Sequence, residues 1–322
     1  MSAEQQALRD AVVQAIQRLG PKTVAQLDDA ERAAKLDAAI DGAGWRELRT
    51  VNDDGGPWAS GVEAAVVAEE LAYGLADAPF LGPTLAADLR RLSGAAPATA
   101  RETVCLTADL GALGHRIAVD AAGATAALVV RDGDVLAAGV GEFRPSVDLT
   151  RQVAGVGGPE ASVGTLASDD HDRWTALGLA LACADLVGVM RGAVDVTSEY
   201  AKQRHQYGVA IGSFQAVQHL LADAFVAMEG SRSIARHAAW AVDALAPSDA
   251  LTAAAAAKAY CARAARSVCE TAIQVHGGIG NTWECLAHVF LRRALVSIDV
   301  LGAEGPNLER VLSAQGITHE LR

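Results

Sequence analysis

Two stretches in the second half of the chain gather side chains that can bind a polar or charged ligand. They cover residues 204–215 and 274–280. Arg204 offers a planar guanidinium that can donate two parallel hydrogen bonds, and the glutamines of both stretches offer amides that donate and accept. Two consecutive glycines, Gly277 and Gly278, lack the Cβ atoms that would keep a backbone away from a binding partner. Together these residue types indicate a binding surface.

Each of these residues also has an ordinary structural interpretation. The glycine pair can be only the C-terminal cap of a helix. Arg204 can be a solvated surface charge or part of a local salt bridge. Tyr207 and Phe214 can be core aromatics, and for Phe214 this is the preferred interpretation. Independent structural needs would rarely reproduce both stretches in one chain, so the joint pattern favours binding.

The spacing of apolar residues predicts the helices that must position these stretches. The predicted helices cover residues 174–203, terminated by Gly208, and residues 248–275, with Ser248 as a cap after Pro247. Between them, apolar residues repeat at three and four positions and predict an amphipathic helix with one buried stripe. The stripe consists of Phe214, Val217, Leu220, Leu221, Ala224 and Met228.

The first half of the chain has a different pattern. Helices are predicted over residues 4–19, 31–48 and 61–92, with a loop at residues 53–57. Short runs rich in Val, Ile and Thr, at residues 103–107 and 126–130, predict strands, and Asp132-Gly133-Asp134 predicts a hairpin turn. The fold class is therefore mostly α-helical with a small β domain. We expect an N-terminal helical domain (1–100), a reduced middle β domain (101–165) and a C-terminal four-helix bundle (166–322).

Composition limits the possible functions. The 322 residues carry a formal net charge of −12, which would repel the phosphates of a nucleic acid or an anionic membrane surface. We saw no run approaching the roughly 18 consecutive apolar residues that cross a bilayer, and the first residues are polar rather than signal-like. We therefore expect a soluble cytoplasmic protein with no nucleic-acid partner and no membrane insertion.

Cysteine and histidine spacing indicates neither disulfides nor a metal site. The five cysteines are odd in number and widely spread, and they form no C-x-x-C pair, so we expect reduced core residues. The eight histidines show no H-E-x-x-H or comparable ligand spacing. No metal ligands are predicted.

Taken together, the two stretches resemble the C-terminal domain of the acyl-CoA dehydrogenase family. The first reads RHQYG at residues 204–208 and continues to FQ at residues 214–215, and the second reads QVHGGIG at residues 274–280. The resemblance extends upstream through residues 62–80 and covers most of the chain, with the β domain as its weakest part. It implies the three-part fold and an enzyme that oxidises an acyl-CoA thioester to its 2,3-enoyl form.

The resemblance also implies a flavin adenine dinucleotide (FAD) cofactor. A guanidinium can grip the FAD pyrophosphate bidentately, which suits Arg204, and amides suit the adenine and ribose end. In the family these groups reach across a dimer interface to a flavin held mainly by the other subunit. The implied cofactor-binding residues are Arg204, Tyr207, Ile211, Gln215, Gln274, Val275, Gly277 and Gly278.

The sequence departs from the family where chemistry would occur. The family uses a glutamate to remove the α-proton while the β-hydride passes to the flavin. By ungapped count the usual base position falls on Leu301 and the alternative position on Gly178, neither of which accepts a proton. Asp299 and Glu304 lie nearby, and a small loop shift could bring one of them into the site. Their ordinary interpretation is that of surface loop carboxylates.

The β domain also lacks the Thr-Glu-Pro-like and Trp-Ile-Thr-like segments that hold the flavin ring in the family. A chain that keeps donated contacts but loses the base and the ring cradle resembles the shorter subunit of the heteromeric, α2β2 acyl-CoA dehydrogenases of actinobacteria, which act on steroid side chains as CoA thioesters. A longer partner subunit and an acyl-CoA substrate are implied. Two alternatives remain: a homo-oligomeric dehydrogenase using Glu304, and a non-catalytic acyl-CoA or protein-binding module that keeps the fold.

Overall fold

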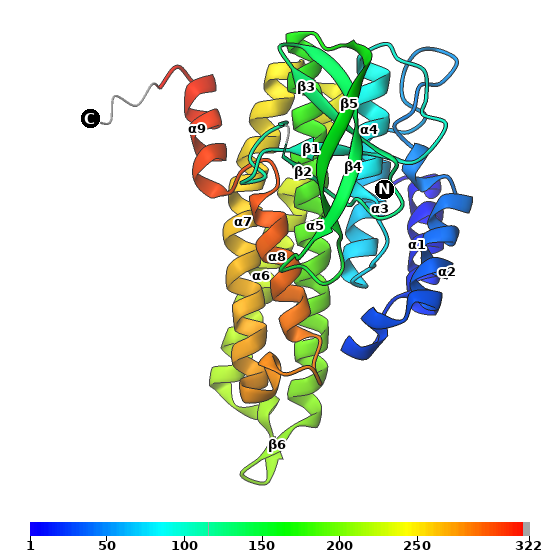
Figure 1. Cartoon of the computed structure of the whole chain (residues 1–322). Coiled ribbons are helices and arrows are strands. Elements are labelled where there is room, and N and C mark those ends of the chain that lie inside the picture. The colour runs from blue at the N-terminus through cyan, green and yellow to red at the C-terminus, as the bar shows by residue number, and fades with distance from the viewer. Residues whose placement is uncertain (115, 318–322) are drawn as a thin grey trace.

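The computed structural model describes residues 1–114 and 116–317, and it places a small β barrel against one side of a long helical bundle (Figure 1). The α-helices are α1 (Ala3–Leu19), α2 (Ala30–Gly42), α3 (Gly61–Tyr73), α4 (Leu81–Leu92), α5 (Ser168–Gln203), α6 (Gln215–Ala244), α7 (Pro247–His276), α8 (Ala287–Asp299) and α9 (Glu304–Ala314). The strands are β1 (Glu102–Leu106), β2 (Ile117–Ala118), β3 (Ala126–Arg131), β4 (Asp134–Arg144), β5 (Val153–Thr165), β6 (His205–Gln206) and β7 (Val209–Ala210). The predicted fold class, mostly helical with a small β domain, is confirmed.

Two of the predicted N-terminal helices are too long. The helix predicted over residues 61–92 is two helices, α3 and α4, because the chain turns at Gly74 and at Leu75, whose φ is 51°, and Pro79 then offers no N–H. The helix predicted over residues 31–48 ends as α2 at Gly42, and Gly44 adopts a left-handed conformation (φ 67°) before a short 3-10 helix, η2 (Trp45–Glu47). The helix predicted over residues 4–19 is present as α1.

Strands β1 to β5 form a closed barrel in the order β1-β2-β5-β4-β3. The predicted strands at residues 103–107 and 126–130 correspond to β1 and β3. The predicted hairpin turn joins β3 to β4, and its central residues Asp132 and Gly133 have φ of 51° and 86°, as a tight turn between twisted strands requires. Closure removes the exposed strand edges that a small sheet would otherwise leave unpaired.

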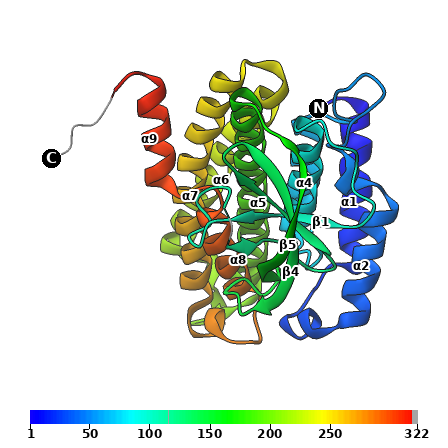
Figure 2. The same cartoon turned by 45° about the horizontal axis from the view of Figure 1, so that its top comes forward.

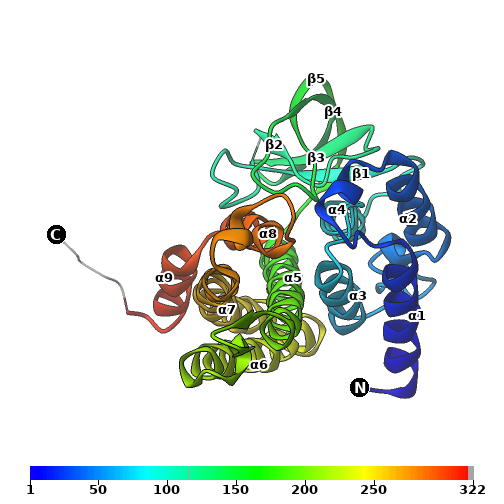
Figure 3. The ribbon, with the colours of Figure 1, turned by 90° about the horizontal axis from the view of Figure 1, so that it is seen from below.

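Helix α5 lies at the centre of the bundle, surrounded by α3, α6, α7 and α8 (Figure 3). It begins at Ser168, earlier than the predicted start at residue 174. Among the described helices, α5 is long and apolar enough to cross a membrane, but 94% of its most apolar window is buried inside the protein. Its central position in the bundle therefore accounts for its composition.

Helix α6 does not bury the predicted stripe. Ala224 and Met228 are buried, but 36% of Phe214 and 38% of Leu220 are exposed. The preferred interpretation of Phe214 as a core aromatic is wrong, because no neighbouring helix buries the first turns of α6, where residues 214–223 are exposed or only half-buried. In addition, Phe225, Val226 and Trp240 on α6 and Tyr260 on α7 are exposed. Helix α6 thus leaves an apolar face uncovered.

The predicted end signals of two bundle helices need correction. Helix α5 ends with Arg204 in an extended conformation, and Gly208 lies farther along in a hairpin turn, so Gly208 does not terminate the helix. Helix α7 begins with Pro247 in its first turn, and Ser248 makes no side-chain cap bond, so Ser248 is not the cap.

The five cysteines are free, as predicted, and four of them are buried.

A buried cluster of charges joins the barrel to the bundle. Asp185 of α5 accepts hydrogen bonds from Arg151 (2.5 Å), which follows the β4 strand, and from Arg293 of α8 (2.7 Å). Ser297 of α8 donates to the second carboxylate oxygen at 2.7 Å. Burial alone raises the pKa of Asp185, but the two guanidiniums outweigh it and hold this pKa below its usual value. The barrel is therefore fixed against the bundle. Helix α1 packs against α3 and α2 on one side of the molecule, and α9 lies on the opposite side (Figure 2).

Candidate functional site

The residues predicted to bind a ligand gather at one end of the bundle. Helix α5 ends there, and the chain makes a hairpin of β6 and β7 before entering the short 3-10 helix η3 (Ile211–Ser213) and α6. The hairpin turn consists of Tyr207 and Gly208, with φ of 52° and 81°. Helix α7 ends at the same end of the bundle, where residues Gly277–Asn281 form the 3-10 helix η4. We call these two segments, residues 204–215 and 274–281, the bundle end.

Three long polar side chains of the bundle end, those of Arg204, Gln215 and Gln274, are exposed and have no hydrogen-bond or ion-pair partner among the described residues. Arg204 is fixed only through its backbone, which donates to Tyr200 O and accepts from Ile211 N, each at 2.8 Å. The backbone is thus ordered while the guanidinium stays free to bind.

The two glycines of the bundle end differ in what they require. Gly277 has φ 64° and ψ −142°, a conformation that only glycine adopts without strain. Gly278 has no positive φ, and an added Cβ would meet no atom of the described residues within 4 Å, apart from its two chain neighbours. The chain's own fold therefore gives no reason for a glycine at position 278. Close approach by a molecule outside the chain is a sufficient reason.

The other predicted contact residues differ in how far they are exposed to solvent. Tyr207 is 93% exposed at the tip of the hairpin, and its ring meets Phe214 edge-on with 6.4 Å between centroids. Ile211 is half-buried, and the side chain of Val275 is buried. Val275 can therefore offer only its backbone to a ligand.

His276 holds the two segments of the bundle end together, a role that sequence reasoning missed. Its imidazole stacks on Tyr200 of α5 with 4.4 Å between ring centroids. Nδ1 donates to Ala272 O at 2.8 Å, and burial lowers the pKa of His276, which favours the neutral ring. The stacked pair fixes the C-terminal end of α7 beside that of α5. The available signal in the sequence was an aromatic residue, Tyr200, near the end of one predicted helix and a histidine, His276, at the end of another.

The two family base positions meet at one point inside the protein. Leu301 follows α8, and a Cβ added to Gly178 of α5 would overlap its side chain. The same added Cβ would lie 3.7 Å from Leu85 of α4. Leu301 is 1% exposed and fills the space between α4 and α5, which we call the Leu301 slot. The described residues bring no carboxylate into contact with this slot.

Three side chains hold the turn that carries Leu301. Lys258 of α7, fully buried, donates from Nζ to Ile298 O (2.6 Å) and Gly302 O (2.8 Å). Asn307 Nδ2 donates to Gly302 O at 2.7 Å, and Arg310 donates to Leu301 O at 2.7 Å. Leu301 itself has φ 58°, and its N–H donates to Leu110 O in the barrel at 2.7 Å. The turn is therefore held in a conformation that leucine rarely adopts.

The role of Lys258 in holding this turn was not predicted from the sequence. Burial lowers the pKa of Lys258 to about 8. A lysine surrounded by Ala254, Ala255, Ala257 and Cys261 on a helix was the available signal, since a lone cation on an apolar face must find acceptors. Here the acceptors are backbone carbonyls at the end of α8.

The candidate alternative base, Glu304, lies outside the Leu301 slot. It begins α9, its side chain is 44% exposed, and its carboxylate lies 3.9 Å from the exposed Arg263 guanidinium. Asp299 is exposed as well. Neither carboxylate can reach the Leu301 slot while the turn keeps its hydrogen bonds.

A helical domain, a closed barrel and a bundle around one long helix, with an exposed Arg–Gln–Gly cluster at the bundle end, define the class of acyl-CoA dehydrogenase folds. Residues 177–310 match the family model of the acyl-CoA dehydrogenase C-terminal domain. The chain is 30% identical to acyl-CoA dehydrogenase IpdE2 of Mycolicibacterium smegmatis, over 97% of this chain and 98% of that protein. The chain therefore belongs to the acyl-CoA dehydrogenase family, whose members are flavoprotein oxidoreductases.

Two solved structures share its fold. The Tcur3481-Tcur3483 steroid ACAD matches with a TM-score of 0.83 and 21% identity, covering 97% of this chain and 98% of that one. The ChsE4-ChsE5 complex from Mycobacterium tuberculosis matches with a TM-score of 0.77 and 22% identity, covering 99% of each chain. At these identities the likeness concerns the fold.

Proposed function

We propose that this chain is the base-less subunit of a heteromeric, FAD-dependent acyl-CoA dehydrogenase. In this proposal its bundle end completes a flavin site on a longer partner subunit, which carries the catalytic carboxylate. The observation that carries the proposal is the contrast within one chain. The side chains of Arg204, Gln215 and Gln274 are exposed and have no partner among the described residues, whereas the Leu301 slot is filled and contains no base. A Cβ added at Gly278 would also meet no described residue beyond its two neighbours.

The residues of the bundle end fit a flavin dinucleotide. Arg204 supplies a free guanidinium for the pyrophosphate, Gln215 and Gln274 supply free amides for the adenosine end, and Gly277 and Gly278 permit backbone contact. When bound, FAD accepts the β-hydride of the acyl chain. The residues of this chain would bind and orient it, and they would exclude water from its phosphates. No residue of the Leu301 slot would move a proton.

The uncovered apolar face of α6 supports an assembly with a second subunit. Val226 is 68% exposed, and Phe225 and Trp240 are about half exposed on the same helix. Exposed aromatic and aliphatic side chains on one helix favour a protein partner over water. The face belongs to the helix that begins at Gln215, so a partner on it lies beside the bundle end. An α2β2 assembly with one flavin for every two chains is the arrangement we propose.

For the acyl group we propose a steroid side chain carried as a CoA thioester. The support is the likeness to a steroid ACAD and to the ChsE4-ChsE5 complex. No described residue of this chain reads the acyl group, since the Leu301 slot is filled. The acyl pocket therefore belongs to the partner in this proposal, and the enzyme acts in the cytoplasm.

The experiment is expression of the chain alone and together with a longer acyl-CoA dehydrogenase from the same genome. We expect a colourless protein alone and a yellow complex on coexpression, with half as many flavins as chains by absorbance and mass. The complex should oxidise steroid acyl-CoA thioesters, and each subunit alone should not.

Two results would replace the proposal. A flavin-to-chain ratio near one in the isolated protein would make it a homo-oligomeric dehydrogenase. A chain that binds acyl-CoA or a protein but takes up no flavin with any partner would be a binding module that has kept the fold.

A further inference from the structure

A cavity of about 570 Å³ lies on the side of α4 away from the Leu301 slot. Its floor is the α4 face formed by Pro83, Ala86, Ala87 and Arg90, which repeat at helical spacing. The opposite face of α4 carries Leu85, which packs at the Leu301 slot. The cavity is therefore separated from that slot by the thickness of one helix, and it has the size of a small-molecule site, about 300–1,000 Å³.

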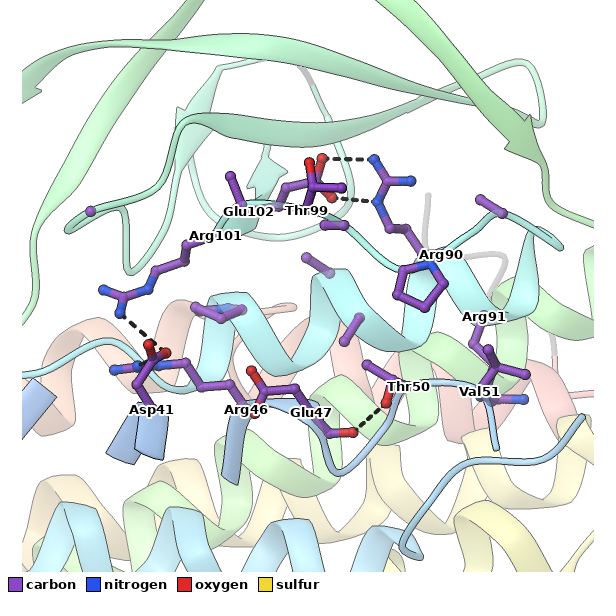
Figure 4. A pocket seen from close by; sticks show the side chains of 18 of the residues that line it. Asp41, Arg46, Glu47, Thr50, Val51, Arg90, Arg91, Thr99, Arg101 and Glu102 are labelled. Atoms are coloured by element: carbon purple, nitrogen blue, oxygen red, sulfur yellow. Dashed lines mark hydrogen bonds and ion pairs between the residues drawn. The ribbon is translucent and has the colours of Figure 1, made fainter. Parts of the chain in front are cut away.

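The cavity walls are ion pairs rather than free charges (Figure 4). Arg90 pairs with Glu102 through two hydrogen bonds, at 2.5 and 2.8 Å. Across the cavity, Asp41 accepts from Arg46 at 2.8 Å and from Arg101 at 3.4 Å. Each of these guanidiniums already has a carboxylate, so an anion would have to displace it. The cavity is not built for a phosphate or a carboxylate.

One ionisable group of the cavity stands apart. Among the described residues that line it, Glu47 is the ionisable one whose side chain has no hydrogen bond or ion pair within the chain. It follows α2 in the short helix η2 and lies exposed at the rim, beside Thr50, which donates to the Glu47 backbone carbonyl at 2.7 Å (Figure 4). The uncompensated charge of the cavity is therefore negative and lies at its mouth.

We propose that this cavity binds a small organic molecule with a flat apolar body and one cationic amine. The apolar body lies on the alanine and proline floor of α4, between the planar Arg90–Glu102 pair and the Arg46–Asp41 pair. Arginine held in an ion pair keeps a flat face on which a ring can stack. The amine lies at the rim against Glu47. This site is independent of the flavin contacts of the bundle end.

The test uses three dyes that share one fluorophore: dansylcadaverine (cation), dansylamide (neutral) and dansylglycine (anion). Fluorescence titration of the full chain should give saturable binding of one dansylcadaverine per chain. Dansylamide should bind about twofold to fivefold more weakly, as expected when a single exposed ion pair of up to about 1 kcal/mol is lost, and dansylglycine more weakly still.

Variants locate the site. Glu47→Gln should remove the preference for the cation, and Glu31→Gln, at an exposed carboxylate of α2 outside the cavity, should keep it. Ala87→Phe should fill the floor and weaken all three dyes at least about tenfold, whereas Ala38→Phe on the exposed face of α2 should not. If circular dichroism shows that Ala87→Phe is unfolded, Thr99→Tyr takes its place. Thr99 lies in the exposed segment, residues 97–100, that lines the cavity opposite α4.

Dansylcadaverine binding that survives both filling variants would place the dye elsewhere, for instance on the apolar face of α6, and would overturn the proposal. Equal affinity for the cation and the anion, or a preference that persists in Glu47→Gln, would overturn the assignment of an amine. Absence of saturable binding by all three dyes would overturn the site.

Discussion

The bundle end and the Leu301 slot both sit where the family would do its chemistry, and they differ in how their polar groups are satisfied. At the bundle end, the side chains of Arg204 and Gln274 have no partner within residues 1–114 and 116–317 and are exposed. Around the Leu301 slot, backbone carbonyls are bonded by Lys258, Asn307 and Arg310, and the apolar space is full. The polar groups around the Leu301 slot are satisfied within the isolated chain, whereas those two side chains of the bundle end are satisfied by water until, in our proposal, flavin binds.

Because of this difference, we expect substitutions in one region to change the stability of the isolated chain and substitutions in the other to change only flavin binding. Substitutions around the Leu301 slot should change the free energy of unfolding, because they leave buried groups unpaired or create cavities. Substitutions at the bundle end should leave unfolding nearly unchanged, because water already solvates the groups they remove. Their effect should appear only in the complex with flavin. Each experiment below tests one side of this division.

The largest effect is expected for Asp185→Ala beside the closed region. Removing this carboxylate leaves the buried Arg293 without its paired carboxylate, and breaking such a pair costs about 3–5 kcal/mol. Arg151 also loses its shortest ion pair but keeps Asp120 at 3.4 Å. Urea denaturation of the isolated chain measures it. The control is Asp195→Ala, which removes only the bond from Tyr73 in an exposed setting and should cost less than about 1 kcal/mol. Equal costs would mean that the buried cluster does not hold the barrel to the bundle.

Lys258 should make stability depend on pH. Its pKa is lowered to about 8 from 10.5, so between these values the unfolded chain binds a proton that the folded chain does not. The free energy of unfolding of the parent relative to Lys258→Met should therefore rise from pH 8 to 10.5, by on the order of 3 kcal/mol. Below pH 8 the difference should be constant.

The comparison with Lys258→Met is needed because buried thiols act in the opposite sense. Burial raises the pKa of Cys105 to about 11 and that of Cys269 to about 12. The unfolded chain loses these protons first, so the stability of both proteins falls as pH rises above about 9. Subtracting the two denaturation curves removes this shared loss. A difference that stays flat to pH 10.5 would mean that Lys258 is protonated throughout.

Arg204→Ala tests the bundle end. In the complex it should weaken flavin retention at least about tenfold, since removing one member of a desolvated charge pair costs about 2–5 kcal/mol. Arg204→Lys should restore only part of it, because an ammonium loses the two-pronged geometry. Flavin content after dialysis is the measurement, with urea denaturation of the isolated chain expected to be unchanged. A full flavin load in the alanine variant would make Arg204 a plain surface residue.

The glycine pair offers an internal comparison. Gly277→Ala should destabilise the isolated chain by about 1–3 kcal/mol, because alanine is strained at φ 64° and ψ −142°. Gly278→Ala should leave the isolated chain within about 0.5 kcal/mol of the parent and yet lower the flavin content of the complex. If Gly278→Ala changes neither property, nothing approaches this backbone closely.

The smallest effect is expected for Glu304→Gln. If the partner supplies the base, turnover of the complex should stay within a few-fold of the parent, whereas loss of a general base costs on the order of 10²- to 10⁴-fold. Steady-state rates with an artificial electron acceptor measure this. A loss in the larger range would make Glu304 catalytic and would require the α8–α9 turn to open.

Local patterns in the sequence were sufficient to predict much of the secondary structure and the fold class of this molecule. The helix over residues 4–19, the β3–β4 turn at Asp132 and Gly133 and the fold class follow from capping, turn chemistry and apolar period, which act between near neighbours. Counting along the chain also led to Leu301 and Gly178 as the two base positions, and they lie in contact. The composition of the bundle end, from Arg204 to Gly278, was likewise evident from the sequence.

Other properties depended on contacts between distant segments. The exposure of Phe214 could not be derived from its helical period, because the period places a residue on a face and only the neighbouring helices decide whether that face is covered. The left-handed conformation of Leu301 is held by Lys258, Asn307 and Arg310 against its own local preference. The sequence determined which side chains are candidates for binding, and it placed Leu301 and Gly178, which accept no proton, at the two predicted base positions. The tertiary structure decided which of those residues stay free, because pairing and burial are set by contacts between residues far apart in the chain.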